Sequence, residues 1–185
     1  MHHRFMDRLA EELAGRGVAT FRYDFPYIEA GRRRPDYPNV LVGTVRSAVA
    51  EASRIAPDLP LLAGGKSMGG RMTSTAAARE PLPDVRGLVF FGFPLHSPAK
   101  PGRERGDHLS GVTVPMLFNQ GTRDTFAKPE LLGPTLDDLG DLATLHSVEG
   151  ADHGFHVLKR SGRTDEDVLE ELAQSTVEWA APILT

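Results

Sequence analysis

One short segment of the chain has the residue pattern of a serine nucleophile. Gly65, Ser67 and Gly69 form the pattern G-x-S-x-G, which follows an apolar strand-like segment at 60–64 and precedes a helix predicted at 68–80. In that context the serine stands on a tight turn between strand and helix, with its hydroxyl clear of the sheet. Glycines fit the flanking positions because larger side chains would collide there. The chemistry indicated is attack by Ser67 on a carbonyl carbon.

A serine hydroxyl is a good nucleophile only when a base takes its proton and a third group orients that base. Downstream, Asp124 follows the apolar segment at 114–120, and His153 follows the one at 142–150. Both residues therefore lie on loops at strand ends. The chain order of nucleophile, acid and histidine matches one known order of a catalytic triad. We predict that Ser67 is the nucleophile, His153 the base and Asp124 the orienting acid.

Each member of this set also has a simpler interpretation when it is taken alone. A G-x-S-x-G string occurs by chance, Asp124 could be a turn residue, and His156 competes with His153 for the role of base. Asp152 and the two histidines could also form a metal site. Their spacing lacks an H-E-x-x-H frame, and Gly154 argues against a helix there, so no metal site is predicted.

The elements that must position these residues alternate between helical and strand-like segments along the chain. Strands are predicted at 18–23, 60–64, 86–92, 114–120 and 142–150, and helices at 3–15, 40–56, 68–80, near 129–139 and from 165 onward. This alternation predicts the α/β class, with a mostly parallel sheet and helices on both faces. The loops at 24–39 and 93–111 are rich in proline, glycine and charge, as is common for loops that line active sites.

Three features of the terminal helices are specific enough to compare with a structure. Thr164 and Asp167 match the capping-box pattern at the start of the last helix. Trp179 is expected to pack on the sheet beside Leu172, because amphipathic terminal helices routinely bury such rings. The first helix is expected to bury a stripe of residues four apart, namely Phe5, Leu9 and Leu13.

Composition excludes several classes of protein. The 185 residues suffice for one compact domain, 1–185, and are too few for two ordinary ones. A net charge of −4, from 21 basic and 25 acidic residues, provides no basic surplus for nucleic acid or a membrane surface. The absence of cysteine excludes a thiol nucleophile, a disulfide framework and thiolate metal sites. No apolar run is long enough to span a membrane and the first residues are not signal-like, so we expect a cytoplasmic protein.

Several motifs together resemble a known family. GGKSMGGRM, followed by QGTRDTF and ADHGFH, resembles the small bacterial α/β-hydrolases of the dienelactone-hydrolase-like group, and FRYDFPY and FGFPLH extend the resemblance over the whole chain. It implies an α/β-hydrolase fold without a lid domain and the triad given above. It also implies that the Met68 N–H is one oxyanion donor and that Tyr27 and Phe93 lie near the substrate pocket. No cofactor is implied.

The sequence departs from that group at its amino-terminal end. Members of the group carry, before the helix at 3–15, a strand and a His-Gly-rich loop whose backbone supplies the second oxyanion donor. We expect an N-terminally shortened sheet, with Met1 either an internal start or the true start of a protein with a weakened site. In the second case the strands at 18–23 and 60–64 are predicted to pair directly.

These observations predict a serine hydrolase that cleaves small esters or thioesters through an acyl-enzyme. The same chemistry leaves a peptidase as an open alternative. The expected partner is a small acyl compound. Lys66, beside the nucleophile, is assigned to the substrate pocket; with Arg71 and the arginines at 32–34 it could attract a carboxylate, although solvated surface cations are a simpler interpretation. The alternative function is a weak or inactive scaffold of the same fold that binds a protein or small ligand.

Overall fold

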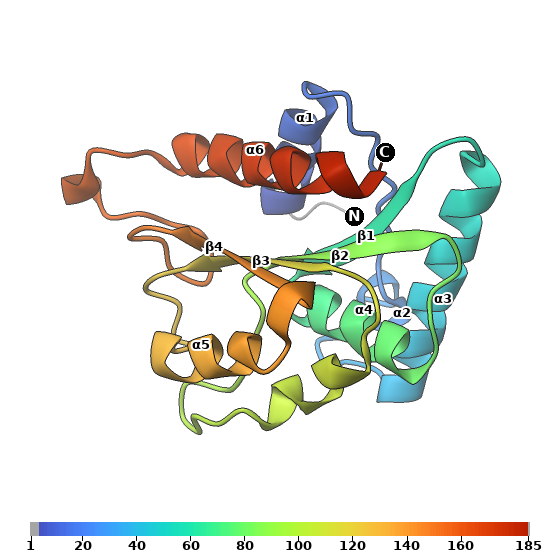
Figure 1. Ribbon diagram of the computed structural model, residues 1–185, viewed down its shortest axis with the longest axis horizontal. Coiled ribbons are helices and arrows are strands. Elements are labelled where there is room, and N and C mark those ends of the chain that lie inside the picture. The colour runs from blue at the N-terminus through green and yellow to red at the C-terminus, as the bar shows by residue number, and fades with distance from the viewer. Residues whose placement is uncertain (1–3, 185) are drawn as a thin grey trace.

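The computed structural model describes residues 4–184, and its centre is a four-stranded parallel sheet (Figure 1). The strands lie in chain order, each hydrogen-bonded to the next: β1 (Leu61–Lys66), β2 (Val85–Phe91), β3 (Met116–Gly121) and β4 (Ala143–Val148). All three pairings are parallel. Parallel neighbours require a crossover between successive strands, and here helices or short helical turns supply it. The predicted α/β class is confirmed.

Helices cover both faces of the sheet, as predicted. α1 (Arg4–Ala14) and α6 (Asp165–Leu184) lie on one face. The other face carries α2 (Pro26–Glu29), α3 (Pro38–Ile55), α4 (Met68–Arg79) and α5 (Pro129–Asp137) (Figure 1). Three 3₁₀ segments complete the described chain: η1 (Glu104–Gly111), η2 (Gly140–Leu142) and η3 (Lys159–Ser161). Within residues 4–184, the connections between strands contain no inserted lid domain.

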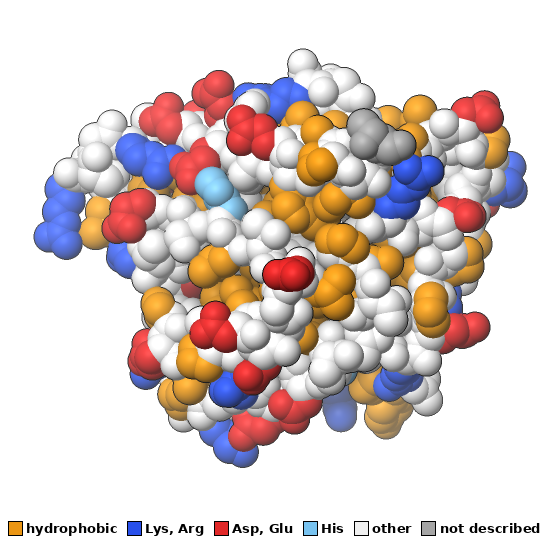
Figure 2. Space-filling model, viewed as in Figure 1, with side chains coloured by type: hydrophobic (Ala, Val, Ile, Leu, Met, Phe, Trp, Pro, Cys, Tyr) orange, Lys and Arg blue, Asp and Glu red, His pale blue; other side chains and the backbone are white. Residues whose placement is uncertain are grey.

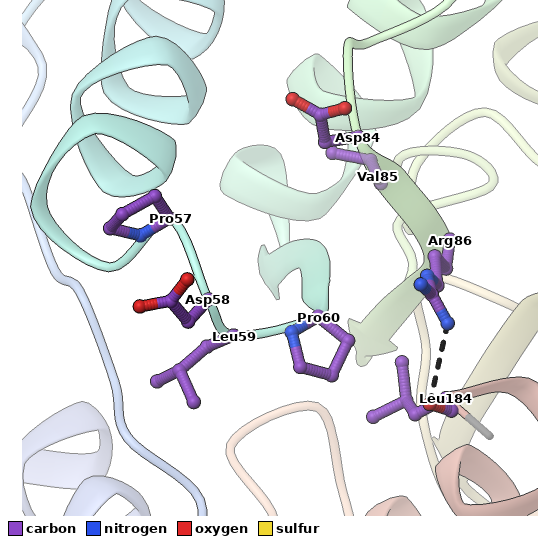
Figure 3. A pocket seen from close by; sticks show the side chains of 8 residues that line it. All are labelled: Pro57, Asp58, Leu59, Pro60, Asp84, Val85, Arg86 and Leu184. Atoms are coloured by element: carbon purple, nitrogen blue, oxygen red, sulfur yellow. Dashed lines mark hydrogen bonds between the residues drawn. The ribbon is translucent and has the colours of Figure 1, made fainter.

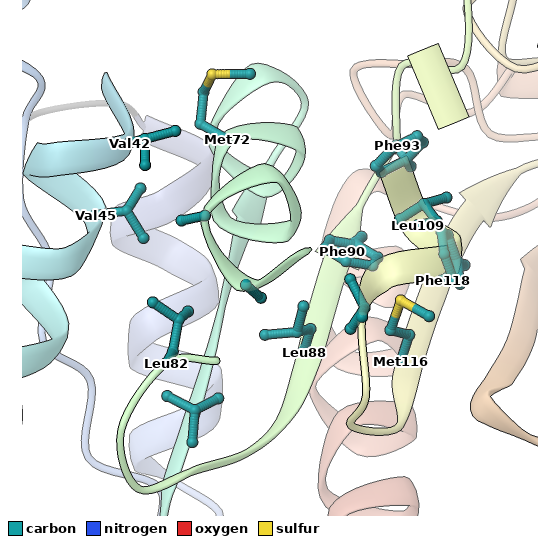
Figure 4. Close-up of a cluster of buried hydrophobic side chains, with 14 of the residues drawn as sticks. Val42, Val45, Met72, Leu82, Leu88, Phe90, Phe93, Leu109, Met116 and Phe118 are labelled. Carbon is teal, nitrogen blue, oxygen red and sulfur yellow. The ribbon is translucent and has the colours of Figure 1, made fainter. Parts of the chain in front are cut away.

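The central strands send alternate side chains into two hydrophobic cores. Leu88 and Phe90 of β2 join the larger core, which they share with α3 and α4 (Figure 4). Val89 and Phe91 point the other way, toward the core beneath α1 and α6. Strands buried on both faces read as continuous apolar runs rather than as alternating ones. The apolar run at 86–92 was therefore a reliable sign of a strand.

The strand predicted at 18–23 does not form, and the predicted pairing of that segment with 60–64 is wrong. Residues 18–25 have no regular secondary structure, and within residues 4–184 β1 pairs with β2 alone. The apolar side chains still pack, Val18 on the core beneath α1 and α6 and Tyr23 on the larger core. A strand needs ladder partners for its backbone groups as well as apolar side chains. This segment has the side chains without the ladder.

The terminal helices pack as the sequence indicates. Leu9 and Leu13 of α1 are buried, and Phe5 is half-buried. The Asp167 N–H donates to the Thr164 hydroxyl at 3.1 Å and the Thr164 N–H donates to the Asp167 carboxylate at 2.7 Å, which is the predicted capping box. Trp179 lies against β2, because a Cβ added to Gly87 would come within 2.8 Å of its ring.

The face at the amino ends of β1 and β2 carries a groove of about 470 Å³ (Figure 3). Residues of the 57–60 turn, the start of β2 and Leu184 line it, and Arg86 donates a hydrogen bond to the Leu184 carbonyl oxygen. Figure 2 shows hydrophobic side chains gathered beneath α6 on one face of the molecule. No helix within residues 4–184 has both the length and the apolar character needed to cross a membrane.

Candidate active site

The predicted site residues come together at the carboxyl ends of the strands, on the side of the sheet opposite the groove. Ser67 connects β1 directly to α4 and has φ 50° and ψ −120°. Such a backbone conformation is rare outside glycine and stores strain that the surrounding structure must hold. The Ser67 N–H donates to the Phe91 carbonyl oxygen at 3.0 Å, and the Ser67 carbonyl accepts from the Arg71 N–H at 3.1 Å. These bonds hold the strained turn on the end of β2 and on the first turn of α4.

The glycines around Ser67 do not share one role. A Cβ on Gly65 would lie 3.2 Å from the Gly70 nitrogen, and a Cβ on Gly70 would lie 2.6 Å from the Gly65 carbonyl oxygen. A Cβ on Gly69 would meet nothing within 4 Å. The prediction that both glycines of the G-x-S-x-G pattern avoid collisions is therefore wrong for Gly69. The close approach of β1 to α4 is made by Gly65 and Gly70 instead.

Among the three predicted triad residues, His153 lies within hydrogen-bond distance of both Ser67 and Asp124. His153 Nε2 is 2.8 Å from Ser67 Oγ, and His153 Nδ1 is 2.7 Å from Asp124 Oδ2. A carboxylate accepts, so Nδ1 must carry the proton and Nε2 is left free to accept the serine proton. This arrangement can raise the nucleophilicity of Ser67 and transfer its proton.

Asp124 is held by partners other than the histidine. Its side chain is buried, Oδ2 also accepts from the Gln120 amide, and Oδ1 accepts from the Phe126 N–H at 2.7 Å. Gln120 Oε1 in turn accepts from the Phe93 N–H at 2.9 Å. Sequence reasoning missed Gln120, although a buried polar residue at the end of an apolar strand was a usable signal.

The imidazole of His153 is fixed on two sides. The Phe126 ring lies with its centroid 4.3 Å from that of His153. On another side Gly92, with φ +69°, approaches so closely that an added Cβ would lie 3.4 Å from Nδ1. Nothing in the sequence marked Phe126, because ring packing between distant loops leaves no local pattern. The result is a half-buried imidazole whose orientation is constrained by packing as well as by Asp124.

The residues assigned to a substrate pocket have different surroundings. Phe93 has no exposed surface, and its ring packs against those of Phe90 and Phe118 in the larger core. Tyr27 lies on α2, half-buried, and burial raises the pKa of its phenol. The Lys66 ammonium donates to the His153 carbonyl oxygen at 2.8 Å and therefore points toward the loop that carries His153.

Met68 is the first residue of α4 and follows Ser67 directly. The first N–H groups of a helix have no intrahelical acceptor, and they lie at the positive end of the helix dipole. The Met68 N–H is thus suited to a negative oxygen that forms beside Ser67.

The residues considered as a metal site turn toward different partners. Asp152 Oδ1 accepts from the backbone N–H groups of Gly154 and His156, and His156 Nδ1 lies 2.6 Å from Asp165 Oδ2. His153 faces Asp124 instead. The side chains therefore do not converge on one point.

Basic residues outside the triad also have defined surroundings, both on the 24–39 segment and beside α4. Arg32 forms an ion pair with Asp36 at 2.7 Å. On α4, Ser74 Oγ is 2.7 Å from His108 Nε2 of η1. Burial lowers the pKa of His108 to about 4, and the Arg71 guanidinium acts in the same direction. His108 is therefore a neutral ring through which η1 packs on α4.

Comparison with known proteins agrees with this fold. The family model described as an alpha/beta hydrolase domain matches residues 1–181. An alpha-beta serine hydrolase homologue from Coxiella burnetii superposes with a TM-score of 0.74 at 19% identity, over 95% of this chain and 77% of that one. A lidless serine hydrolase from Xanthomonas campestris gives 0.73 at 20% identity, over 97% and 75%. An esterase domain from Rhodothermus marinus gives 0.71 at 16% identity, over 98% and 82%.

Proposed function

Because the chain belongs to the alpha/beta hydrolase domain family, we propose that it is a serine hydrolase of small esters or thioesters. The observation that carries the proposal is the relay from Ser67 Oγ through His153 to Asp124, with donor–acceptor distances of 2.8 and 2.7 Å. The esterase and serine hydrolase folds among the structural neighbours support the same reaction class.

The first half of the reaction forms an acyl-enzyme. Ser67 Oγ bonds to the substrate carbonyl carbon while its proton passes to His153 Nε2, and the carbonyl electron pair moves onto oxygen. The Met68 N–H donates to that oxygen. As the intermediate collapses, the bond to the alcohol or thiol breaks, and the leaving group takes the proton from Nε2.

The second half regenerates the serine. Water gives a proton to Nε2 and attacks the acyl carbon, and the resulting intermediate expels Ser67 Oγ, which takes the proton back. In both halves the imidazole is transiently cationic. The buried Asp124 carboxylate stabilises that cation and keeps the ring in the tautomer that accepts at Nε2.

The test is intact-mass measurement after incubation with a fluorophosphonate, together with hydrolysis of a short chromogenic ester. The wild type is expected to gain one adduct and to turn over the ester, whereas Ser67→Ala does neither. Ser110→Ala is the matched control, because Ser110 is an exposed serine on η1. A folded wild type with no adduct and no turnover would reject the proposal and favour the scaffold that binds without catalysis.

A further inference from the structure

Lys66 joins the nucleophile strand to the loop of the base. It is the last residue of β1 and directly precedes Ser67, yet its side chain does not extend into solvent. Its Nζ donates to the backbone carbonyl oxygen of His153 at 2.8 Å, across 87 positions of sequence. One side chain therefore connects the two segments whose separation sets the distance from Ser67 Oγ to His153 Nε2.

Two aromatic rings enclose the same ammonium. Nζ lies 4.5 Å from the ring centroid of Phe5 on α1 and 4.8 Å from that of Phe155. The two rings stack on each other with centroids 5.4 Å apart. A cation over the face of an aromatic ring is attracted by its quadrupole. Phe155 holds a φ of +65°, which is unusual for a bulky residue and indicates a loop held firmly by its surroundings.

The partial burial of this cation must be compensated by other interactions. An ammonium prefers water, and its removal from water costs free energy unless hydrogen bonds and charges replace the lost hydration. Burial lowers the pKa of Lys66 to about 8, while the carboxylates of Asp124 and Asp152 act in the opposite direction. A solvated surface lysine would provide none of these contacts, so the buried arrangement indicates a specific role.

We propose that Lys66 is a positioning residue: its ammonium holds the His153 carbonyl and thereby keeps the imidazole within reach of Ser67. The inference rests on the proposed function, because the role of Lys66 depends on His153 acting as a base. It also replaces the assignment of Lys66 to the substrate pocket. In this arrangement Lys66 acts on the rate of the chemical step and makes no contact with substrate.

The arrangement predicts a dependence on pH. The groups that act on the ammonium are the carboxylates of Asp124 after β3 and Asp152 after β4, the backbone carbonyl of His153, and the rings of Phe155 and of Phe5 from α1. Above a pH of about 8 the neutral amine keeps at most a weaker hydrogen bond and loses its attraction to the rings. Turnover is therefore expected to fall as the pH rises through this value.

The experiment compares Lys66→Met and Lys66→Arg with the wild type and with Lys100→Met, which changes an exposed lysine. For Lys66→Met we expect kcat to fall about 10- to 100-fold, the loss typical of a small misplacement of a catalytic group, with little change in KM. Lys66→Arg should recover part of the rate and move the alkaline limb of the pH profile upward, because arginine stays charged. Lys100→Met should match the wild type.

A wild-type kcat in a folded Lys66→Met would overturn the proposal, and a rise in KM alone would return Lys66 to the substrate pocket. If Lys66→Met does not fold, the alkaline limb of the wild type and its shift in Lys66→Arg decide the question; an unshifted limb would reject the inference.

A second readout separates this inference from the proposed function. The proton on His153 Nδ1, bonded to Asp124, is expected to give a downfield proton NMR signal in the wild type that weakens in Lys66→Met. If the wild type proves inactive, the proposed function fails, while the NMR signal still decides whether Lys66 positions His153. If turnover is normal and the signal does not depend on Lys66, only the positioning role fails.

Discussion

Gln120 and Asp124 form the buried hydrogen bond that ties the proposed triad acid to the end of β3. The Gln120 amide group uses both of its functions, since its N–H donates to Asp124 and its oxygen accepts from the Phe93 N–H. The acid is thus oriented by a side chain that is itself anchored to the backbone of the loop after β2. A catalytic group oriented in this way depends on residues that never contact substrate.

Replacement of Gln120 by alanine is expected to lower both stability and activity. The buried Phe93 N–H would lose its acceptor, which costs about 1–3 kcal/mol of unfolding free energy. Asp124 would lose one of its orienting donors, and we expect kcat to fall about tenfold or more. Urea denaturation and ester hydrolysis measure the two effects. Gln174→Ala, on the exposed face of α6, is the control, and a normal kcat in Gln120→Ala would show that Asp124 needs no such support.

Asp124→Asn tests the tautomer of His153. The asparagine amide donates to Nδ1, which leaves the proton on Nε2, where it blocks transfer from Ser67. By the behaviour of serine triads in general, kcat should fall about 10⁴-fold while the fold persists. Fluorophosphonate labelling of Ser67 should slow in parallel. Asp141→Asn changes an exposed aspartate and should have no effect; retention of more than a tenth of the activity in Asp124→Asn would remove Asp124 from the triad.

The two glycines that follow Met68 should respond oppositely to alanine. Gly70→Ala places a Cβ 2.6 Å from the Gly65 carbonyl oxygen and 3.0 Å from the Phe90 ring, and such overpacking costs about 1–3 kcal/mol. Gly69→Ala has open space and adds a better helix former, so stability should be unchanged or rise by up to about 1 kcal/mol. Urea denaturation of both variants decides this, and equal losses would mean that Gly69 is also in close contact.

Sequence patterns predicted the sheet well where strands are buried on both faces. The apolar runs at 86–92 and 114–120 correspond to β2 and β3 within two residues at each end. Residues 18–23 carry similar residue types but form no strand. The difference lies in the ladder partner, which is a property of tertiary structure and leaves no mark in the segment itself.

The placement of the triad followed from topology. In a parallel sheet the residues after successive strands meet at one edge, so Ser67, Asp124 and His153 could be placed together from their positions alone. The direction of a side chain at that edge could not be predicted. Lys66 turns toward the His153 carbonyl and Phe93 turns into the core, because packing with distant segments selects the rotamer.

The neutral state of His108 predicts how stability depends on pH. Because burial and Arg71 lower its folded pKa to about 4, the unfolded chain, with an ordinary value of 6.5, binds the proton more readily between these limits. Stability should therefore decrease as the pH falls from about 6.5 toward 4. In His108→Gln this contribution disappears, so the loss of unfolding free energy between about pH 7 and about pH 5 should be smaller than in the wild type.

Ser74→Ala should keep the wild-type dependence, because burial and Arg71, rather than the Ser74 hydroxyl, set the pKa of His108. Urea denaturation at both pH values tests all three proteins, and an identical pH dependence in His108→Gln would mean that the ring is protonated in the folded state as readily as in the unfolded one.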